Sequence, residues 1–176
     1  MPGQAVHNVS VVIPVYGGSA TLRQVVGELS TFYTEQMSQG GNRFRIAEVI
    51  LVDDCGEDDS ALVMRELASK DDHVVSVWLT RNFGQHAATI AGMASSSHEW
   101  VMTMDEDGQH NPASIGALID TALRSESPLV YGRESNREPH SFIRNFMSKL
   151  VKQLVLPLIV GKKNFRYFSS FRLMTG

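Results

Sequence analysis

Short apolar runs rich in β-branched residues recur along the first three quarters of the chain, separated by longer stretches with helical periodicity. The run at residues 9–15 (VSVVIPV) is apolar at nearly every position, which is typical of a strand buried on both faces of a sheet. A polar stretch with two glycines at residues 38–43 predicts a loop. Taken together, the apolar runs predict strands at residues 9–15, 48–52, 74–79, 100–104 and 128–131.

The segments between these strands have the pattern of amphipathic helices. Apolar residues recur every three or four positions within residues 22–32, and Ser19 precedes them as a candidate N-cap. Further helices are predicted at residues 58–70, at residues 86–94 and after Asn111-Pro112, where a capping residue precedes a proline. The alternating order predicts an α/β fold in which a mostly parallel sheet has helices on both faces.

The composition is that of one globular domain, because 43% of the 176 residues are hydrophobic and 20% are charged. The single cysteine, Cys55, excludes an internal disulfide framework and a cysteine zinc cluster, and it is compatible with a reducing compartment. The N-terminal residues lack a signal-peptide pattern, and no uninterrupted apolar run reaches the roughly 18 residues of a membrane-spanning helix. We therefore expect a cytoplasmic protein.

Charge is distributed unevenly, although the net charge is only −3. Residues 1–132 carry 7 Lys and Arg against 17 Asp and Glu, whereas residues 133–176 carry 9 against 2. The acidic part predicts handling of a cation, and the basic part predicts contact with an anion. Chance clustering of charge on solvated surfaces is the alternative explanation.

Acidic residues follow two of the predicted strands. Asp53 and Asp54 end the second strand, and Asp105 and Asp107 follow the fourth. Ligands of such sheets bind beyond the carboxyl ends of the strands, so all four carboxylates are expected on one rim. An Asp-x-Asp pair offers hard oxygen ligands that suit Mg²⁺ or Mn²⁺ with bridging phosphates. Capping of the following helix is the alternative role for Asp53 or Asp54.

Three kinds of site contain an Asp-x-Asp-Gly sequence like the one at residues 105–108. An EF-hand loop needs a carboxylate at its twelfth position, where this chain has Gly116. A phosphotransferase of the haloacid-dehalogenase type uses the first aspartate as nucleophile, but its motif usually ends the first strand, and the acids of the second strand would have no role. The third kind is the metal-binding Asp-x-Asp of a glycosyltransferase that uses a nucleotide sugar.

Five segments, in order along the chain, resemble the family 2 glycosyltransferases of GT-A fold. They are residues 11–16 (VVIPVY), 48–54 (EVILVDD), 79–85 (LTRNFGQ), 104–110 (MDEDGQH) and 170–174 (SFRLM). The ordered set covers nearly the whole chain and is far more specific than Asp-x-Asp alone. Within the family, the chain is most similar to polyprenyl-phosphate sugar transferases, such as dolichol-phosphate mannose synthase and the bacterial undecaprenyl-phosphate glycosyltransferases.

The resemblance implies a metal-dependent, inverting transfer of a sugar from a nucleotide-diphosphate sugar to a polyprenyl phosphate. It implies that Asp105 and Asp107 bridge to the diphosphate through Mg²⁺ or Mn²⁺, with Asp107 the more direct ligand. It also implies that residues 14–16 line the base and ribose pocket and that Gln109 and His110 lie near the donor sugar. The complete set implied to contact the nucleotide sugar is Pro14, Val15, Tyr16, Asp53, Asp54, Arg81, Asp105, Gln109 and His110.

The acceptor is expected to be held by arginines. A lipid phosphate is already anionic at neutral pH and needs no strong general base, so catalysis would rest on positioning and on charge stabilisation by Asp105 and Asp107 with their metal. Arg133 and Arg137 follow the fifth predicted strand and are therefore the first candidates for the acceptor phosphate and for catalysis. Arg172 is a further candidate, and solvated surface arginines are the alternative.

The basic part of the chain also predicts contact with a membrane. Residues 141–160 combine apolar residues at helical spacing with interspersed cations, which is typical of a helix that lies in the membrane interface and not of one that spans it. Lys162 and Lys163 extend the positive charge and would attract anionic lipid. We therefore expect peripheral contact with the inner face of a membrane. An ordinary helix that covers the sheet is the alternative.

Two departures from the family pattern affect the expected organisation. Relatives often carry an Asp a few residues before Phe-Arg-Leu, but residues 164–169 contain none, and the chain stops at Gly176 directly after that motif. We expect residues 1–132 to form the nucleotide-sugar-binding core and residues 133–176 to form an acceptor- and membrane-facing segment of the same domain, truncated at its C-terminus. A non-lipid acceptor, or a fragment that binds nucleotide sugar without turnover, remains an alternative. No nucleic-acid partner is expected, and the sugar, the nucleotide and the oligomeric state stay open.

Overall fold

Seven strands form one sheet in the computed structural model, which describes residues 5–132 and 170–175. The strand order is β2-β3-β1-β5-β7-β6, and β4 also pairs with β3. Pairing is parallel among β1, β3, β4 and β5, whereas β2 and β7 run antiparallel to their neighbours. The strands are β1 (His7–Val15), β2 (Gln36–Met37), β3 (Arg43–Asp53), β4 (Val74–Trp78), β5 (Trp100–Thr103), β6 (Leu129–Tyr131) and β7 (Arg172–Thr175).

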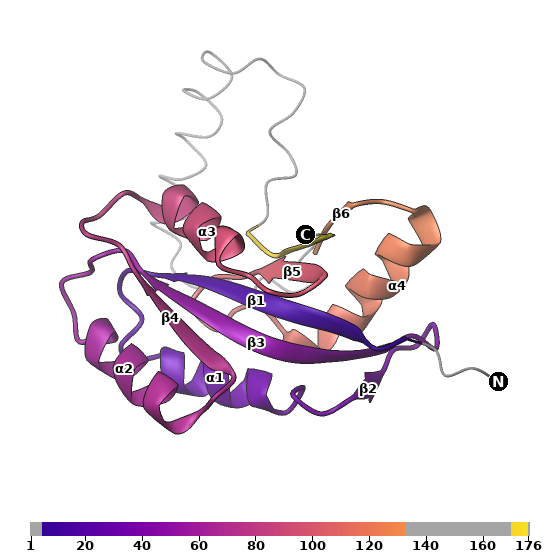
Figure 1. Cartoon of the computed structure of the whole chain (residues 1–176), viewed down its shortest axis with the longest axis horizontal. Helices are drawn as coiled ribbons and strands as arrows, with labels where there is room; N and C mark the ends of the chain where they lie inside the picture. The colour runs from indigo at the N-terminus through magenta and orange to yellow at the C-terminus, as the bar shows by residue number, and fades with distance from the viewer. Residues whose placement is uncertain (1–4, 133–169, 176) are drawn as a thin grey trace, which may run out of the picture. The chain divides into compact units, whose positions relative to one another are not determined.

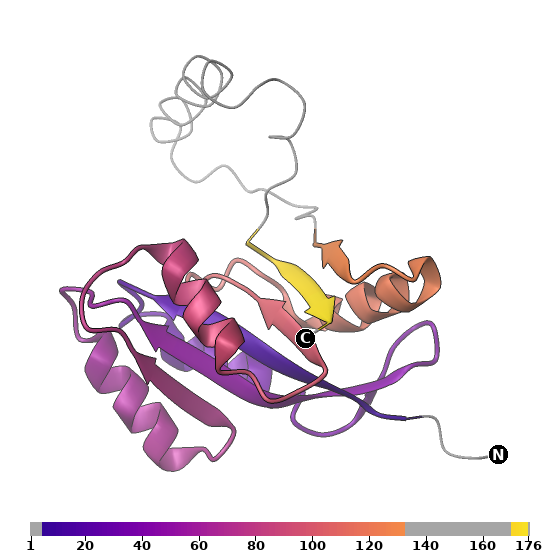
Figure 2. The ribbon, with the colours of Figure 1, turned by 45° about the horizontal axis from the view of Figure 1, so that its top comes forward.

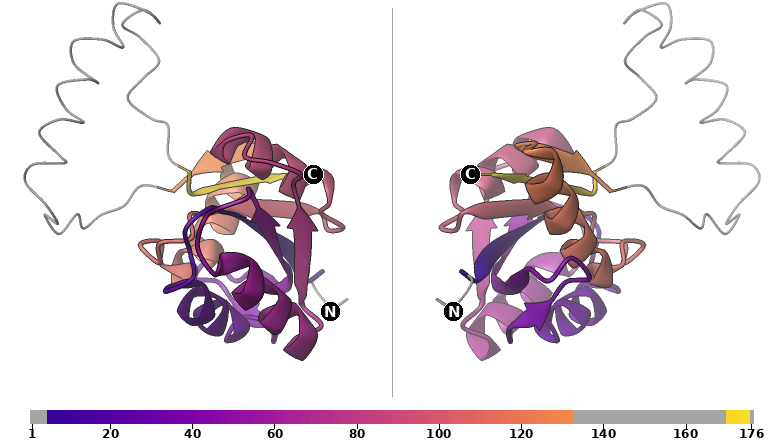
Figure 3. Two further views of the ribbon diagram at one scale, coloured as in Figure 1. Left: turned by 90° about the vertical axis from the view of Figure 1, so that its left-hand side faces the viewer. Right: turned by 90° about the vertical axis from the view of Figure 1, so that its right-hand side faces the viewer.

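Helices cover both faces of this sheet, as the sequence predicts. The helices are α1 (Leu22–Ser30), α2 (Ser60–Lys70), α3 (Gln85–Ala94) and α4 (Ile115–Ser125), with a 3₁₀ turn at Pro112–Ser114 before α4. Apolar residues of α1, α2 and α4 share one core with the sheet, whereas α3 packs on the opposite face (Figures 1 and 3). No helix in the described part of the chain is long and apolar enough to span a membrane.

The central strand β1 is buried on both faces, which confirms the expectation from its continuous apolar run. Val11 and Ile13 belong to the larger core under α1, α2 and α4, and Val12 between them belongs to the smaller core under α3. Helix α3 approaches β1 closely at Gly92, where an added Cβ would lie 2.4 Å from Val12 Cγ1. This close contact fixes α3, and with it the loop before α3, above the carboxyl half of the sheet.

Two strands and part of a third were not predicted from the sequence. Strand β2 has two residues in a stretch next to the predicted loop, and β3 begins at Arg43, five residues before the predicted start. Strand β7 lies between β5 and β6, antiparallel to both (Figure 2). The predicted fifth strand therefore pairs with a C-terminal segment and not with its parallel neighbour. Such pairings depend on distant parts of the chain, so no local pattern indicates them.

The helix boundaries agree with the predictions to within about two residues, but the predicted N-cap of α1 is wrong. Ser19 is not its N-cap, because α1 begins only at Leu22 and the Ser19 backbone N–H donates to the Asp58 carboxylate at 3.0 Å. The predicted cap at Asn111 is confirmed, since its Oδ1 accepts a hydrogen bond from the Ala113 N–H at 2.9 Å.

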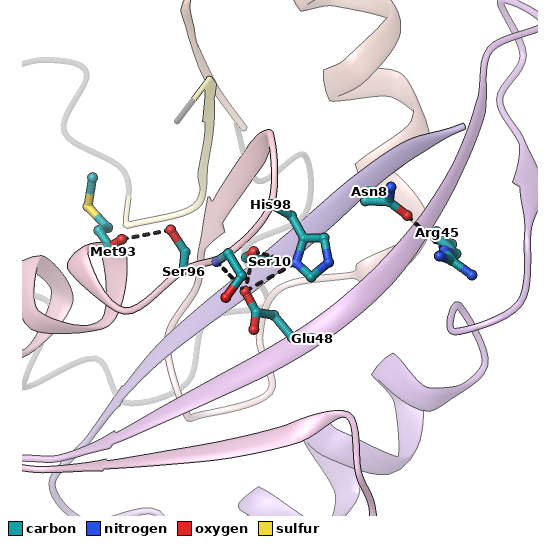
Figure 4. Close-up of polar contacts among 8 residues, drawn as sticks. Asn8, Ser10, Arg45, Glu48, Met93, Ser96 and His98 are labelled. Atoms are coloured by element: carbon teal, nitrogen blue, oxygen red, sulfur yellow. Dashed lines mark hydrogen bonds and ion pairs between the residues drawn. The ribbon is translucent and has the colours of Figure 1, made fainter. Parts of the chain in front are cut away.

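A buried polar cluster lies near the amino ends of the central strands (Figure 4). Glu48 is only 8% exposed, and its Oε1 accepts hydrogen bonds from Ser10 Oγ and the Ser97 N–H, both at 2.7 Å. His98 Nδ1 lies 3.2 Å from the same oxygen. Burial alone would raise the pKa of the Glu48 carboxyl, but these hydrogen bonds outweigh it and hold the pKa below its usual range. The cluster is at the opposite end of the strands from the acidic rim, so its role is in the stability of the fold.

Candidate active site

Strand register brings the predicted acids to one rim. Val15 of β1 pairs with Asp53 of β3, which in turn pairs with Trp78 of β4, so these parallel strands end side by side. A cleft of about 460 Å³ opens at this rim. Its lining is formed by Pro14, Val15, Tyr16, Asp54, Asn82, Gly84, Gln85, Asp105, Glu106 and Asp107. The structure therefore brings together six of the residues singled out in the sequence, and it adds Asn82, Gly84, Gln85 and Glu106.

The adjacent acids Asp53 and Asp54 have different surroundings. The Asp54 carboxylate accepts the backbone N–H groups of Phe83 at 2.7 Å and of Gly84 at 2.9 Å, and it therefore fixes the loop between β4 and α3. Asp53 is absent from the cleft lining and lies near Arg65 of α2. Burial raises the pKa of Asp53, opposed by the Cys55 N–H and by the charge of Arg65. Of the two acids, only Asp54 lines the cleft.

Asp105 is held from two sides. Gln85 Nε2 donates to its Oδ1 at 2.6 Å, and Ser170 Oγ donates to its Oδ2 at 2.5 Å. His110 Nε2 lies 3.5 Å from Oδ2. Burial alone would raise the pKa of Asp105, but interactions with His110, Ser170 and Gln85 hold it below the usual value. Asp105 is therefore an anchored carboxylate that stays ionised.

Asp107 is the more accessible member of the pair. Its side chain is exposed in the cleft, and its Oδ1 accepts the Gln109 N–H at 3.0 Å in a turn at the start of the following loop. Gln109 is exposed as well, but it is not part of the cleft lining. Of the two aspartates of the motif, Asp107 is thus the one whose carboxylate faces solvent.

His110 lies beneath the rim and outside the cleft lining. Its side chain is buried, and its ring stacks on that of Phe171 with a centroid distance of 4.8 Å. Its Nε2 is 3.3 Å from Ser170 Oγ. His110 thus contacts Asp105 and the two residues before β7. In this position it supports Asp105 and does not line the cleft.

Of the four arginines singled out in the sequence, the structure describes two, Arg81 and Arg172. The Arg81 guanidinium stacks over the Phe83 ring at 4.4 Å, and Arg81 is not part of the cleft lining. Arg172 Nε donates to Thr103 Oγ1 at the end of β5, at 3.1 Å. Arg133 and Arg137 lie outside the described residues, as do the predicted interfacial helix and the segment without an Asp before Phe-Arg-Leu.

Sequence reasoning missed four polar residues of this site, which are Asn82, Gln85, Glu106 and Ser170. Ser170 belongs to the quoted Ser-Phe-Arg-Leu segment, but only the fold brings it to Asp105, 65 positions away. Gln85 directly follows Arg-Asn-Phe-Gly, and Glu106 stands between the two aspartates, so both were inside motifs already noted. A third acid between two expected metal ligands was the available signal for Glu106.

The carboxylates at the cleft suit a divalent cation that takes part of its ligands from a bound molecule. Within residues 5–132 and 170–175, no three His, Cys, Asp or Glu side chains lie close enough together to hold a metal ion. Asp105 and Asp107 border the same cleft, and the other two carboxylates of its lining, Asp54 and Glu106, are engaged by backbone N–H groups. Mg²⁺ is commonly bound by one or two carboxylates together with substrate phosphates, so the residues fit a cation that arrives with a phosphate ligand.

Comparison with known proteins finds a family and several named relatives that this chain resembles. The sequence profile described as "Glycosyl transferase family 2" matches residues 10–172. An undecaprenyl-phosphate 4-deoxy-4-formamido-L-arabinose transferase of Proteus mirabilis (strain HI4320) is 35% identical over 153 residues, which are 86% of this chain and 44% of the relative. The chain thus spans less than half the length of the curated relatives it matches.

Solved structures with a similar fold include a mannosyltransferase and a synthase. The mannosyltransferase PcManGT of Pyrobaculum calidifontis, in complex with GDP-Man and Mn²⁺, gives a TM-score of 0.57 at 16% identity and covers 72% of this chain and 35% of that chain. Glucosyl-3-phosphoglycerate synthase of Mycobacterium tuberculosis, in complex with UDP, gives a TM-score of 0.55 at 22% identity. The similarity covers 96% of this chain and 57% of that chain. These similarities confirm the GT-A fold predicted from the sequence.

Proposed function

The chain belongs to glycosyl transferase family 2, and on that premise we propose that it transfers a sugar from a nucleotide-diphosphate sugar to undecaprenyl phosphate or a related polyprenyl phosphate. The acceptor class is supported by the names of the curated relatives, which are undecaprenyl-phosphate sugar transferases. The donor class is supported by the ligands named for the structural neighbours, GDP-Man and UDP.

The observation that carries the proposal is the cleft itself. It is lined by the end of β1, with the half-exposed residue Tyr16, and by the carboxylates of Asp105 and Asp107 from the loop after β5. Its volume of about 460 Å³ falls in the range of small-molecule sites. An aromatic and apolar wall opposite paired carboxylates suits a nucleoside joined to a diphosphate that brings a divalent cation.

In the proposed reaction, Asp107 and the anchored Asp105 would hold Mg²⁺ or Mn²⁺. A bound cation supplies charge neutralisation for the leaving diphosphate. The acceptor phosphate is already anionic, so no side chain has to remove a proton. A phosphate oxygen of the lipid forms a bond to the anomeric carbon while the bond from that carbon to the diphosphate oxygen breaks, which inverts the anomeric centre. The protein contributes orientation and exclusion of water.

The acceptor side of the proposal rests on the basic part of the chain. Arg133 and Arg137 are proposed to bind the lipid phosphate, and the cations of residues 141–163 are proposed to attract anionic lipid at the cytoplasmic face of the membrane. Arg172 is a weaker candidate for this role, because its Nε is engaged by Thr103 Oγ1.

A thermal-shift series followed by a transfer assay tests the function. We expect one of UDP-, GDP- or dTDP-sugars to raise the Tm in the presence of Mn²⁺, and its labelled sugar to pass to undecaprenyl phosphate in detergent. If no nucleotide sugar stabilises the protein with metal present, the donor assignment fails. If donor binding occurs but a soluble saccharide replaces the lipid as acceptor, the lipid assignment fails.

Substitution of the two proposed acceptor arginines tests the lipid site. The double variant R133Q/R137Q should raise the KM for undecaprenyl phosphate by about 10- to 100-fold, because each arginine provides charge-assisted hydrogen bonds to phosphate. The KM for the donor should stay unchanged. R124Q, which removes an exposed arginine of α4, serves as the control. An unchanged lipid KM in the double variant would remove these arginines from the acceptor site.

A further inference from the structure

Glu106, the middle residue of Asp105-Glu106-Asp107, has both carboxylate oxygens engaged by the opposite wall of the cleft. The Tyr16 N–H donates to Oε2 and the Gly17 N–H donates to Oε1, both at 3.0 Å. The contact is therefore bidentate, and it joins the loop after β5 to the loop between β1 and α1. These two loops are 89 and 90 positions apart at the points of contact.

Two further contacts hold the same pair of loops together. Thr21 Oγ1 donates to the backbone oxygen of Glu106 at 2.6 Å. Gly18 passes so close to the carboxylate that an added Cβ would lie 2.6 Å from Oε2. A glycine at position 18 thus permits the approach that the carboxylate makes to the loop.

This engagement separates Glu106 from Asp107. Asp107 turns its carboxylate to solvent, whereas Glu106 uses its two oxygens on backbone N–H groups of the wall that carries Tyr16. Hydrogen bonds to a charged acceptor are stronger than those between neutral groups, so the bidentate contact is well suited to fix the distance between the walls.

We propose that Glu106 is a positioning residue that sets the width of the cleft between the Tyr16 wall and the Asp105–Asp107 loop, and thereby the affinity for the nucleoside part of the donor. The inference rests on the proposed function, because it assigns the Tyr16 wall to the nucleoside and the aspartate loop to the diphosphate. Glu106 acts through the backbone of residues 16 and 17 and does not bind the cation.

Nucleotide binding with and without metal tests this role. Glu106→Gln preserves volume but replaces one acceptor oxygen by an NH₂ group that faces an N–H donor. The affinity for UDP or GDP, whichever binds the unaltered protein, should fall by about 10-fold both with Mn²⁺ and without it. Glu99→Gln, an exposed glutamate at the amino end of β5, is the matched control and should leave both affinities unchanged.

A second variant keeps the test decisive if Glu106→Gln folds poorly. Gly18→Ala displaces the Glu106 carboxylate without changing its chemistry, so it should weaken nucleotide binding both with and without Mn²⁺. The double variant should bind nucleotide no more weakly than the weaker-binding single variant, because both changes disrupt the same contact. A loss confined to Mn²⁺-containing samples would make Glu106 a metal ligand and overturn the inference, as would unchanged affinities. Absence of nucleotide binding by the unaltered protein would instead overturn the proposed function, and the inference with it.

Discussion

Replacement of Asp107 by asparagine should lower sugar transfer by at least about 100-fold, since even the residues that support a metal ligand typically contribute 10- to 100-fold to activity. Asparagine keeps the shape of the side chain and the Oδ1 atom that accepts the Gln109 N–H. The local turn should therefore persist while the negative charge is lost. Initial rates with saturating donor and lipid, measured over a Mn²⁺ titration, give the size of the effect.

The same variant has a binding signature that separates it from Glu106→Gln. Asp107→Asn should abolish the Mn²⁺-dependent part of nucleotide binding and leave the metal-independent part intact. Asp72→Asn, which neutralises an exposed aspartate at the opposite end of the strands, is the control for the change in net charge. Full retention of the Mn²⁺-dependent binding in Asp107→Asn would place the cation elsewhere.

Replacement of Glu48 by alanine should destabilise the fold by about 3 kcal/mol, because it leaves the buried Ser10 hydroxyl and the partly buried Ser97 N–H without their acceptor. Chemical denaturation followed by circular dichroism measures this loss. Glu48→Gln retains an acceptor oxygen and should cost less. Glu99→Ala removes an exposed glutamate and should have a much smaller effect.

The Glu48 cluster should also contribute to the pH dependence of stability. The pKa of Glu48 is lowered in the folded state from an ordinary value of 4.5, so the unfolded chain takes up the proton first as the pH falls. The stabilising contribution is therefore complete above that ordinary value and is lost as the pH falls through the folded pKa. The free energy of unfolding of Glu48→Gln should decline less steeply in this acid range than that of the unaltered protein. Parallel curves for the two proteins would exclude a lowered pKa.

Three carboxylates of the acidic rim support the loops around the cleft. Asp54 fixes the loop before α3, Asp105 is held by Gln85 and Ser170, and Glu106 joins the two walls of the cleft. Each of these carboxylates accepts hydrogen bonds from loops or side chains far away in the sequence. This use of negative charge as a structural acceptor allows several acids to stay close together around one cleft.

The strand and helix pattern, the α/β fold and the position of the acids could be predicted from the sequence. A continuous apolar run marks β1 as a strand buried on both faces, and parallel strands end at the same edge of a sheet, so acids that follow β3 and β5 must share that edge. The cap at Asn111 was equally predictable, because its bond to Ala113 spans only two residues. The ordered motifs also indicated the family that the comparisons confirmed.

The role of each of those acids depends on how distant parts of the chain pack around it. Whether an aspartate faces solvent, as Asp107 does, or is anchored, as Asp105 is, depends on donors such as Ser170 that reach the rim through strand β7. The insertion of β7 between β5 and β6 and the contact of Glu106 with the β1–α1 loop have the same origin. Sequence periodicity reports which face of an element is buried, but hydrogen bonds between segments 65 to 90 positions apart are set by how those elements pack.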